Sequence, residues 1–143
     1  FNGGIVLDRM DQPARAIEVY REAARIFEKR YGADNINVVY TRGNIGWALA
    51  ELKRYDEAYA ETAAVLPDFI RLEGANALNT GYILNNLGII RERQGRHDEA
   101  IRLNLRATAI YNRYGEQSLD ASRWSYHSLS KSFRAKGKTA MAI

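Results

Sequence analysis

The sequence predicts an all-α fold, an α-α superhelix (solenoid) of about three to four antiparallel helical hairpins. The chain has 143 residues and only two prolines, and its apolar residues recur at helical spacing, which favours long helices. A period of 42 residues separates three glycines and three alanines: Gly4, Gly46, Gly88 and Ala16, Ala58, Ala100. A period of this length built from helices is typical of stacked hairpins, which present a concave binding surface.

The start and stop signals of the helices recur with this period. Pro13 suits the first turn of a helix, and Gly32 can end it in the left-handed conformation. Asp34 is expected to cap the following helix through its side-chain oxygen, and Asn76 and Ser118 are expected to cap later ones. We expect helices at residues 1–10, 13–31, 35–53, 56–73, 77–94, 97–114 and 119–136, with another beginning at 139.

Three local features refine this expectation. Gly46 is expected to face Ala58 and Gly88 to face Ala100, where the two helices of a hairpin cross closely. Pro67 lies inside an expected helix, which it should kink or end unless it is tolerated on the outer face. Residues 136–139 have the sequence K-G-K-T, which lacks the upstream glycine of a phosphate loop and is expected to be the turn of the fourth hairpin.

Composition and charge narrow the class of protein. The chain has no cysteine, so it has neither disulfides nor thiolate metal sites, which agrees with a cytoplasmic protein. No apolar stretch is long enough to span a membrane. The net charge of +4 arises entirely in residues 113–143, because the fifteen basic and fifteen acidic residues of 1–112 cancel. A neutral body with one basic end makes nucleic acid an unlikely partner.

The residues give no sign of catalysis. His97 takes the place of Tyr55 in the previous repeat, which predicts a packing or turn role. His127 lies beside Ser128, but adjacent residues point to different sides of a helix, and no carboxylate is spaced to orient the imidazole. Metal-binding motifs are absent from the sequence. We therefore expect no enzyme activity, no metal and no cofactor.

Several repeated motifs resemble those of tetratricopeptide repeat (TPR) proteins. The matching residues are Leu87-Gly88 with Ala100, Ala16 with Tyr20, and Tyr126, Leu129 and Phe133. The departures are Thr62 and Asn104 for an aromatic residue, Ser130 for glycine, and Arg91 for an aromatic residue. The 42-residue period, the N-N-L-G motif at 85–88 and the Y-G pairs at 31–32 and 114–115 are similar to the longer repeats of kinesin light chains and their bacterial relatives.

The resemblance also predicts the organisation of the chain. Residues 1–143 are expected to form a single TPR-like domain, with repeats at about 1–34, 35–76, 77–118 and a partial repeat at 119–143. Both ends fall inside a repeat, so we expect this chain to be a fragment of a longer protein. Residues 133–143 are similar to the last repeat before the caspase-like CHAT protease domain of bacterial proteins.

In TPR architecture the first helix of each hairpin lines the concave face, so inward positions at 42-residue spacing are candidates for ligand contact. An asparagine row suits a peptide backbone, and an aromatic row suits peptide side chains. These rows are Asn2, Asn44, Asn86, Ser128; Tyr40, Tyr82, Trp124; and Ile5, Trp47, Ile89, Lys131. The same positions also suit packing between repeats, in which case they only hold the superhelix together.

Three functions fit these observations. The favoured one is a scaffold module that binds a protein or peptide in the concave groove. The second is the regulatory or sensor region of a larger enzyme, such as a CHAT protease, and it is compatible with the first. The third is self-assembly through exposed repeat ends.

Overall fold

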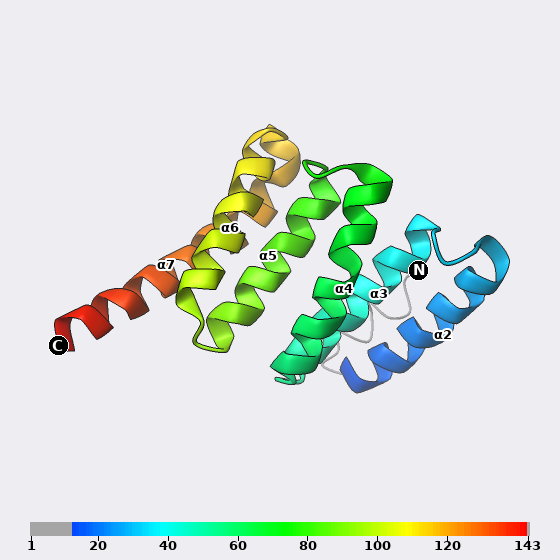
Figure 1. The fold of residues 1–143 in the computed structure, drawn as a ribbon, viewed down its shortest axis with the longest axis horizontal. Helices are drawn as coiled ribbons and strands as arrows, with labels where there is room; N and C mark the ends of the chain where they lie inside the picture. Colours follow the sequence, from blue (N-terminus) through cyan, green and yellow to red (C-terminus); the bar gives the residue numbers. More distant parts are fainter. Residues whose placement is uncertain (1–12, 143) are drawn as a thin grey trace. The chain divides into compact units, whose positions relative to one another are not determined.

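The structure is a computed structural model that describes residues 13–142, and the side chains of 13–137. The expected helix at 1–10, and with it Asn2, Gly4 and Ile5, lies outside this part. All regular elements of the described part are helices, which confirms the all-α fold class (Figure 1). They are α2 Pro13–Tyr31, α3 Ile36–Glu51, α4 Tyr55–Glu73, α5 Leu78–Arg93, α6 His97–Asn112, the short 3-10 helix η1 Gly115–Ser118, and α7 Leu119–Ala142.

The chain divides into two compact units, Phe1–Leu72 and Glu73–Ile143. In the first unit α2 packs against α3, and α3 approaches α4 closely at Gly46. Large side chains of all three helices are buried here, namely Tyr20, Val38, Val39, Leu49, Val65 and Phe69. Their helical spacing explains why the pattern of apolar residues predicted these helices so closely.

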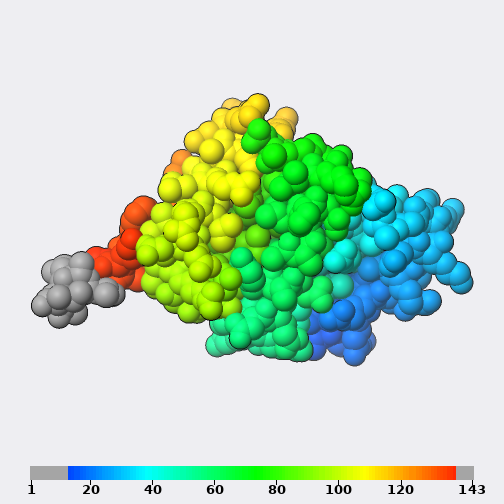
Figure 2. Space-filling view, in the orientation of Figure 1, coloured from blue at the N-terminus to red at the C-terminus, as the bar shows by residue number. Residues whose placement is uncertain are grey.

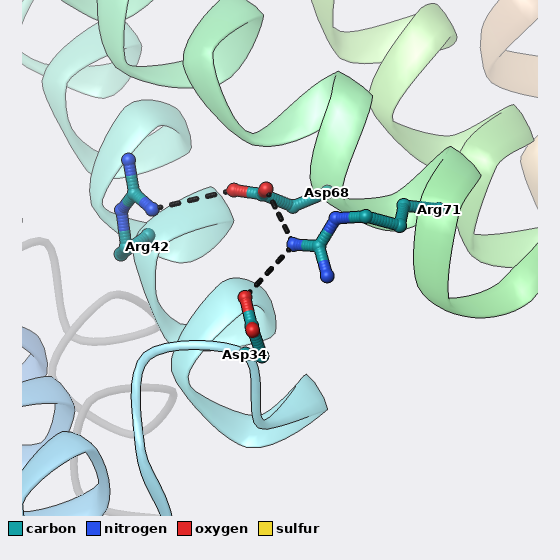
Figure 3. Close-up of polar contacts among 4 residues, drawn as sticks. All are labelled: Asp34, Arg42, Asp68 and Arg71. Carbon is teal, nitrogen blue, oxygen red and sulfur yellow. Dashed lines mark hydrogen bonds and ion pairs between the residues drawn. The ribbon is translucent and has the colours of Figure 1, made fainter.

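A network of four charged residues joins helix ends and faces within the first unit (Figure 3). The Arg71 guanidinium of α4 lies 2.9 Å from a carboxylate oxygen of Asp68 and 3.1 Å from one of Asp34. Arg42 of α3 lies 3.5 Å from Asp68. The four side chains are 28% to 81% exposed, so we expect each ion pair to contribute little to the stability of the fold.

In the second unit the helices α5, α6 and α7 all contact one another. Arg91 of α5 forms an ion pair with Glu99 of α6, with 2.8 Å between Nε and the carboxylate. Asp98 of α6 forms an ion pair with Lys136 of α7. Short turns between the helices make successive helices antiparallel, so α5 and α7 run in the same direction (Figure 1).

The predicted caps of the helices are wrong in detail. Asn35, and not Asp34, caps α3, because its Oδ1 accepts a hydrogen bond of 2.9 Å from the backbone N–H of Asn37. The N-cap of α5 is Ala77, which follows Asn76 and has no capping side chain. Ser118 uses its hydroxyl as a donor, at 2.7 Å to the carbonyl of Tyr111. A polar residue near a helix start thus predicted the helix but not its capping atom.

The end of α7 contradicts the predicted turn at 136–139 and the helix expected to begin at 139. Lys53 and Gly95 end α3 and α5 in the left-handed conformation, with φ of 61° and 79°. Gly137 occupies the third position of this series, but α7 continues through it to Ala142. On α5 the turn lets α6 pack back against the helix it follows, whereas no described helix packs on the corresponding face of α7.

The expected pairing of glycine with alanine is also corrected. A Cβ on Gly88 would lie 2.5 Å from Oδ1 of Asn104, and a Cβ on Gly46 would overlap the hydroxyl of Thr62. The close partner therefore lies one helical turn beyond the predicted alanine. Thr62 and Asn104 are 42 residues apart, and both are completely buried. Pro67 does not end α4, and its side chain is exposed.

Candidate functional site

The residues of the aromatic row differ in how far their side chains are exposed. Trp124 on α7 has 58% of its surface exposed, and Tyr40 on α3 has 45%. Tyr82 on α5 is partly buried against Tyr111 of α6, with ring centroids 5.7 Å apart. In the second unit α5 and α7 are neighbours that run in the same direction, so the 42-residue register puts Tyr82 and Trp124 at matching places on adjacent helices.

Tyr111 of α6 packs against Tyr82 of α5 and also contacts the α5 backbone. Its hydroxyl donates a hydrogen bond of 3.0 Å to the carbonyl of Gly81, and its side chain is completely buried. Burial is the main cause that raises the pKa of Tyr111 above its usual range. A Cβ on Gly81 would lie 3.0 Å from Cε1 of Tyr111, so only glycine lets α5 and α6 approach this closely. Tyr82 therefore rests on a rigid support.

The asparagine row is less accessible than the aromatic row. Asn44 and Asn86 are partly buried, and Nδ2 of Asn44 is buried with no hydrogen-bond partner among the described residues. Ser128, the fourth member, is buried and accepts a hydrogen bond of 2.8 Å from Nδ2 of Asn104. At this one place the row joins two helices, which is the packing role that the sequence left open.

The third row changes character along the chain. Trp47 on α3 is partly buried, and Ile89 on α5 is only 7% exposed. Lys131, at the same place on α7, is exposed. In the second unit the surface next to Tyr82 thus passes from apolar on α5 to cationic on α7. In the first unit one residue of each row, Tyr40, Asn44 and Trp47, lies on α3.

A seam of hydroxyl groups between α6 and α7 is the main feature that the sequence analysis missed. Thr108 and Ser125 share a hydrogen bond of 2.8 Å between their hydroxyl oxygens, and Asn104 binds Ser128 as described above. Ser132, one turn further along α7, is also completely buried. The signal was the spacing of serines at 125, 128 and 132, which lie on one face of a helix. This face positions α7, and with it Trp124 and Lys131.

The two histidines are not brought together. His97 is partly buried at the start of α6, whereas His127 is exposed on α7. Ser128 is buried, which confirms that His127 and Ser128 point to different sides of their helix. Among the described residues no group of three or more His, Cys, Asp or Glu side chains is placed to hold a metal ion. Of the helices in the described part, none is both long and apolar enough to cross a membrane.

Comparison with known proteins decides the family. The tetratricopeptide repeat family matches residues 3–60, 64–113 and 79–143. The chain belongs to the tetratricopeptide repeat family. Its fold is therefore that of a repeat scaffold, a class that typically mediates protein interactions and is generally non-catalytic. A search of curated protein sequences finds no match.

Two solved structures share the fold of this TPR chain. BtubC (BKLC) from P. vanneervenii has a TM-score of 0.82 and 22% identity, over 94% of this chain and 54% of that one. A protein from Podospora anserina described as a kinesin light chain, with nearly identical TPR-like repeats, has a TM-score of 0.80 and 16% identity, over 97% of this chain and 66% of that one. These neighbours confirm the fold of stacked helical repeats, and this chain spans about half to two thirds of their lengths.

Proposed function

We propose that this TPR chain binds an extended peptide on the first-helix surfaces that carry the aromatic row. The observation that carries the proposal is the exposure of Trp124, 58%, at the place that Tyr82 occupies on the neighbouring helix. The exposed indole ring presents a large apolar area to water. A ligand that covers the ring gains binding free energy from burying this area, and the tryptophan side chain loses little conformational entropy. The membership of a family that typically mediates protein interactions supports the same conclusion.

The second unit offers such a peptide a surface that is apolar on α5 and positively charged on α7. Tyr82 is fixed by Tyr111, Ile89 adds buried apolar surface beside it, and Lys131 adds an exposed positive charge on α7. A rigid aromatic contact and a flexible cation suit a peptide that presents both an apolar side chain and a hydrogen-bond acceptor. In the first unit, Tyr40 supplies the corresponding exposed aromatic contact.

Asn44 and Asn86 take a secondary place in this proposal. Their side chains are only partly accessible, and each can contribute one amide group to a peptide backbone. The unpartnered Nδ2 of Asn44 is a donor that a peptide carbonyl would satisfy. Replacing both with alanine separates the two interpretations. Lower peptide affinity with an unchanged thermal midpoint supports contact with ligand, and a lower thermal midpoint with unchanged affinity supports packing.

The test is a screen of the whole chain against an array of synthetic extended peptides, followed by titration of each hit. Tryptophan fluorescence reports on binding, and a Trp47→Phe variant assigns the signal to Trp124. Trp124→Ala should weaken binding by roughly fivefold or more, because truncation of a central aromatic contact costs more than about 1 kcal/mol. Leu105→Ala is the matched control, since Leu105 is 50% exposed on α6. Equal affinities of the two variants would refute the proposal.

A further inference from the structure

The first helices of two complete hairpins differ on the side that packs against their second helices. We call α3 with α4 the first hairpin, and α5 with α6 the second hairpin. Gly46 marks the packing side of α3 and Gly88 that of α5, because an added Cβ would meet Thr62 or Asn104 of the second helix. The residues four before and three after each glycine lie on the same side of the helix. These residues are Arg42 and Leu49 on α3, and Leu84 and Arg91 on α5.

Arginine and leucine occupy opposite places in the two hairpins. On α3 the arginine, Arg42, lies away from the turn, and Leu49 lies near the turn. On α5 Leu84 lies away from the turn, and Arg91 lies near the turn. Leu49 and Leu84 are 1% and 0% exposed, and Nε of Arg91 lies 2.8 Å from a carboxylate oxygen of Glu99. Since each hairpin contains both of its helices, equivalent environments are being compared.

The second helices match this difference at the end of the hairpin away from the turn. Asp68 of α4 lies opposite Arg42, with 3.5 Å between Oδ2 and Nη1 (Figure 3). The residue 42 positions later on α6 is Ile110, which is 4% exposed in the contact with α5. Near the turn both second helices have glutamate, Glu57 and Glu99. The first hairpin thus has a charged pair where the second has apolar side chains.

We propose that Arg42 and Asp68 select the second helix on which α3 packs, and that Arg42 keeps α3 from packing on α6. Mispairing of similar elements is a characteristic failure of repeat proteins. Against α6, Arg42 takes the place of the buried Leu84 near Ile110, where no carboxylate compensates the charge. A buried charge without its partner is strongly destabilising. One rejected pairing is enough, because α5 can pack on α4 only if α3 is left with α6.

The exposure of the pair supports a role in selection. The side chains of Arg42 and Asp68 are 37% and 28% exposed, so their attraction adds little to the stability of the native hairpin. Asp68 also pairs with Arg71 at 2.9 Å, so its charge is compensated without Arg42. The penalty of a wrong pairing therefore falls on Arg42. The same charge has a small effect in the native hairpin and a large one in the mispaired state.

Refolding of the whole chain from urea tests the proposal. Arg42→Leu with Asp68→Ile gives the first hairpin the residues of the second at these places. The share of chains that regain the native monomer should fall by roughly half, because neither pairing is then excluded. The thermal midpoint of the purified monomer should stay the same or rise. Size-exclusion chromatography measures the monomer, and Trp47 emission in a Trp124→Phe background reports on the packing of α3. Complete refolding, or a clearly lower midpoint, would overturn the proposal.

Single variants separate the charge of Arg42 from its other properties. Arg42→Lys keeps a positive charge that α6 rejects, so it should refold like the unchanged chain, whereas Arg42→Leu should not. Arg106→Leu is the matched control, because Arg106 is exposed on α6, whose outer surface is uncovered in Figure 2 (yellow-green to yellow). Equal refolding of the lysine and leucine variants, or an equal loss with Arg106→Leu, would contradict the selection.

A further variant keeps the test decisive if Arg42→Leu with Asp68→Ile does not fold. Leu84→Arg with Ile110→Asp makes the two hairpins alike in the opposite way, since both then carry the charged pair. Selection is lost again, so the share of native monomer should also fall. A role of the pair in stability alone predicts no such loss, and full refolding of this variant would refute the proposal.

Discussion

The two sides of α6 are built in different ways. Toward α5, the contact is close and largely apolar, with Tyr111 and Ile110 packed against Gly81 and Asn104 packed against Gly88. Toward α7, the contact depends on hydroxyl groups, with Leu129 the large apolar residue that α7 buries. A close apolar contact is sensitive to added volume, whereas a hydroxyl seam is sensitive to lost hydrogen bonds. The hairpin is thus fixed by shape and its neighbour by polar pairing.

The largest effect should come from adding volume on the α5 side. Gly88→Leu places a side chain where the amide of Asn104 lies within 2.6 Å of the first added atom. We expect a loss of roughly 3 kcal/mol in the free energy of unfolding, because neither helix can move without opening the hairpin. The thermal midpoint followed by circular dichroism measures it. Ala109→Leu, at an exposed site on α6, is the control and should leave the midpoint nearly unchanged.

A smaller effect should come from removing a hydrogen bond on the α7 side. Ser128→Ala removes the acceptor for Nδ2 of Asn104. Oδ1 of Asn104 already has no partner among the described residues, so the variant leaves the whole amide unpaired. We expect a loss of roughly 1.5 kcal/mol in urea unfolding. Ser130→Ala, two residues away and exposed, should change stability by less than about 0.5 kcal/mol, and an equal loss in both would argue against the seam.

Tyr111 offers a comparison through pH. Burial raises its pKa above the ordinary value of 10.0, so the folded protein keeps the phenolic proton longer than the unfolded chain does. The contribution to stability is therefore present below about pH 10 and is lost as the pH rises above it. Tyr111→Phe should cost about 1 kcal/mol at neutral pH by removing the bond to Gly81. It should also flatten the loss of stability in urea titrations above about pH 10. An unchanged alkaline slope would show that other tyrosines cause it.

The smallest effect should have the opposite sign. The hydroxyl of Ser132 is buried with no hydrogen-bond partner among the described residues. Ser132→Ala removes this group and should stabilise the protein by up to about 1 kcal/mol. Urea unfolding at neutral pH measures the difference, and Ser130→Ala again serves as the exposed control. A clear loss of stability would mean that Ser132 does bond within the seam.

The sequence predicted the helices of this chain well, because each repeat carries its own start, stop and apolar spacing. The bounds of α2 agree completely, and those of α3 to α6 agree to within two residues. The caps at Asp34 and Asn76 failed because two adjacent polar or small residues can each begin a helix, and only the backbone geometry selects one. The turn at 136–139 failed because the glycine signal is local, whereas a hairpin turn depends on the helix that packs back.

Predictions for the candidate site were less complete, for a physical reason. The 42-residue register identifies equivalent positions, but equivalent positions do not have equal exposure. Trp124 is exposed and Ile89 is buried, although both were expected on the concave face. The hydroxyl seam was visible only as serine spacing, because a serine on a helix gives no signal of its neighbour. The concave rows therefore stay a prediction, for which Trp124 provides the sharpest test.

The pairing of glycine with a polar residue across each hairpin bears on how such repeats can be exchanged. Gly46 is matched to Thr62, and Gly88 is matched to Asn104. A single helix transferred between repeats would bring a glycine against the partner residue of another repeat. The fit would then change, because asparagine is larger than threonine. Recombination that moves both helices together keeps the fit. The hairpin is therefore the unit that keeps its packing when it is exchanged, and engineered arrays should be cut between hairpins and never within them.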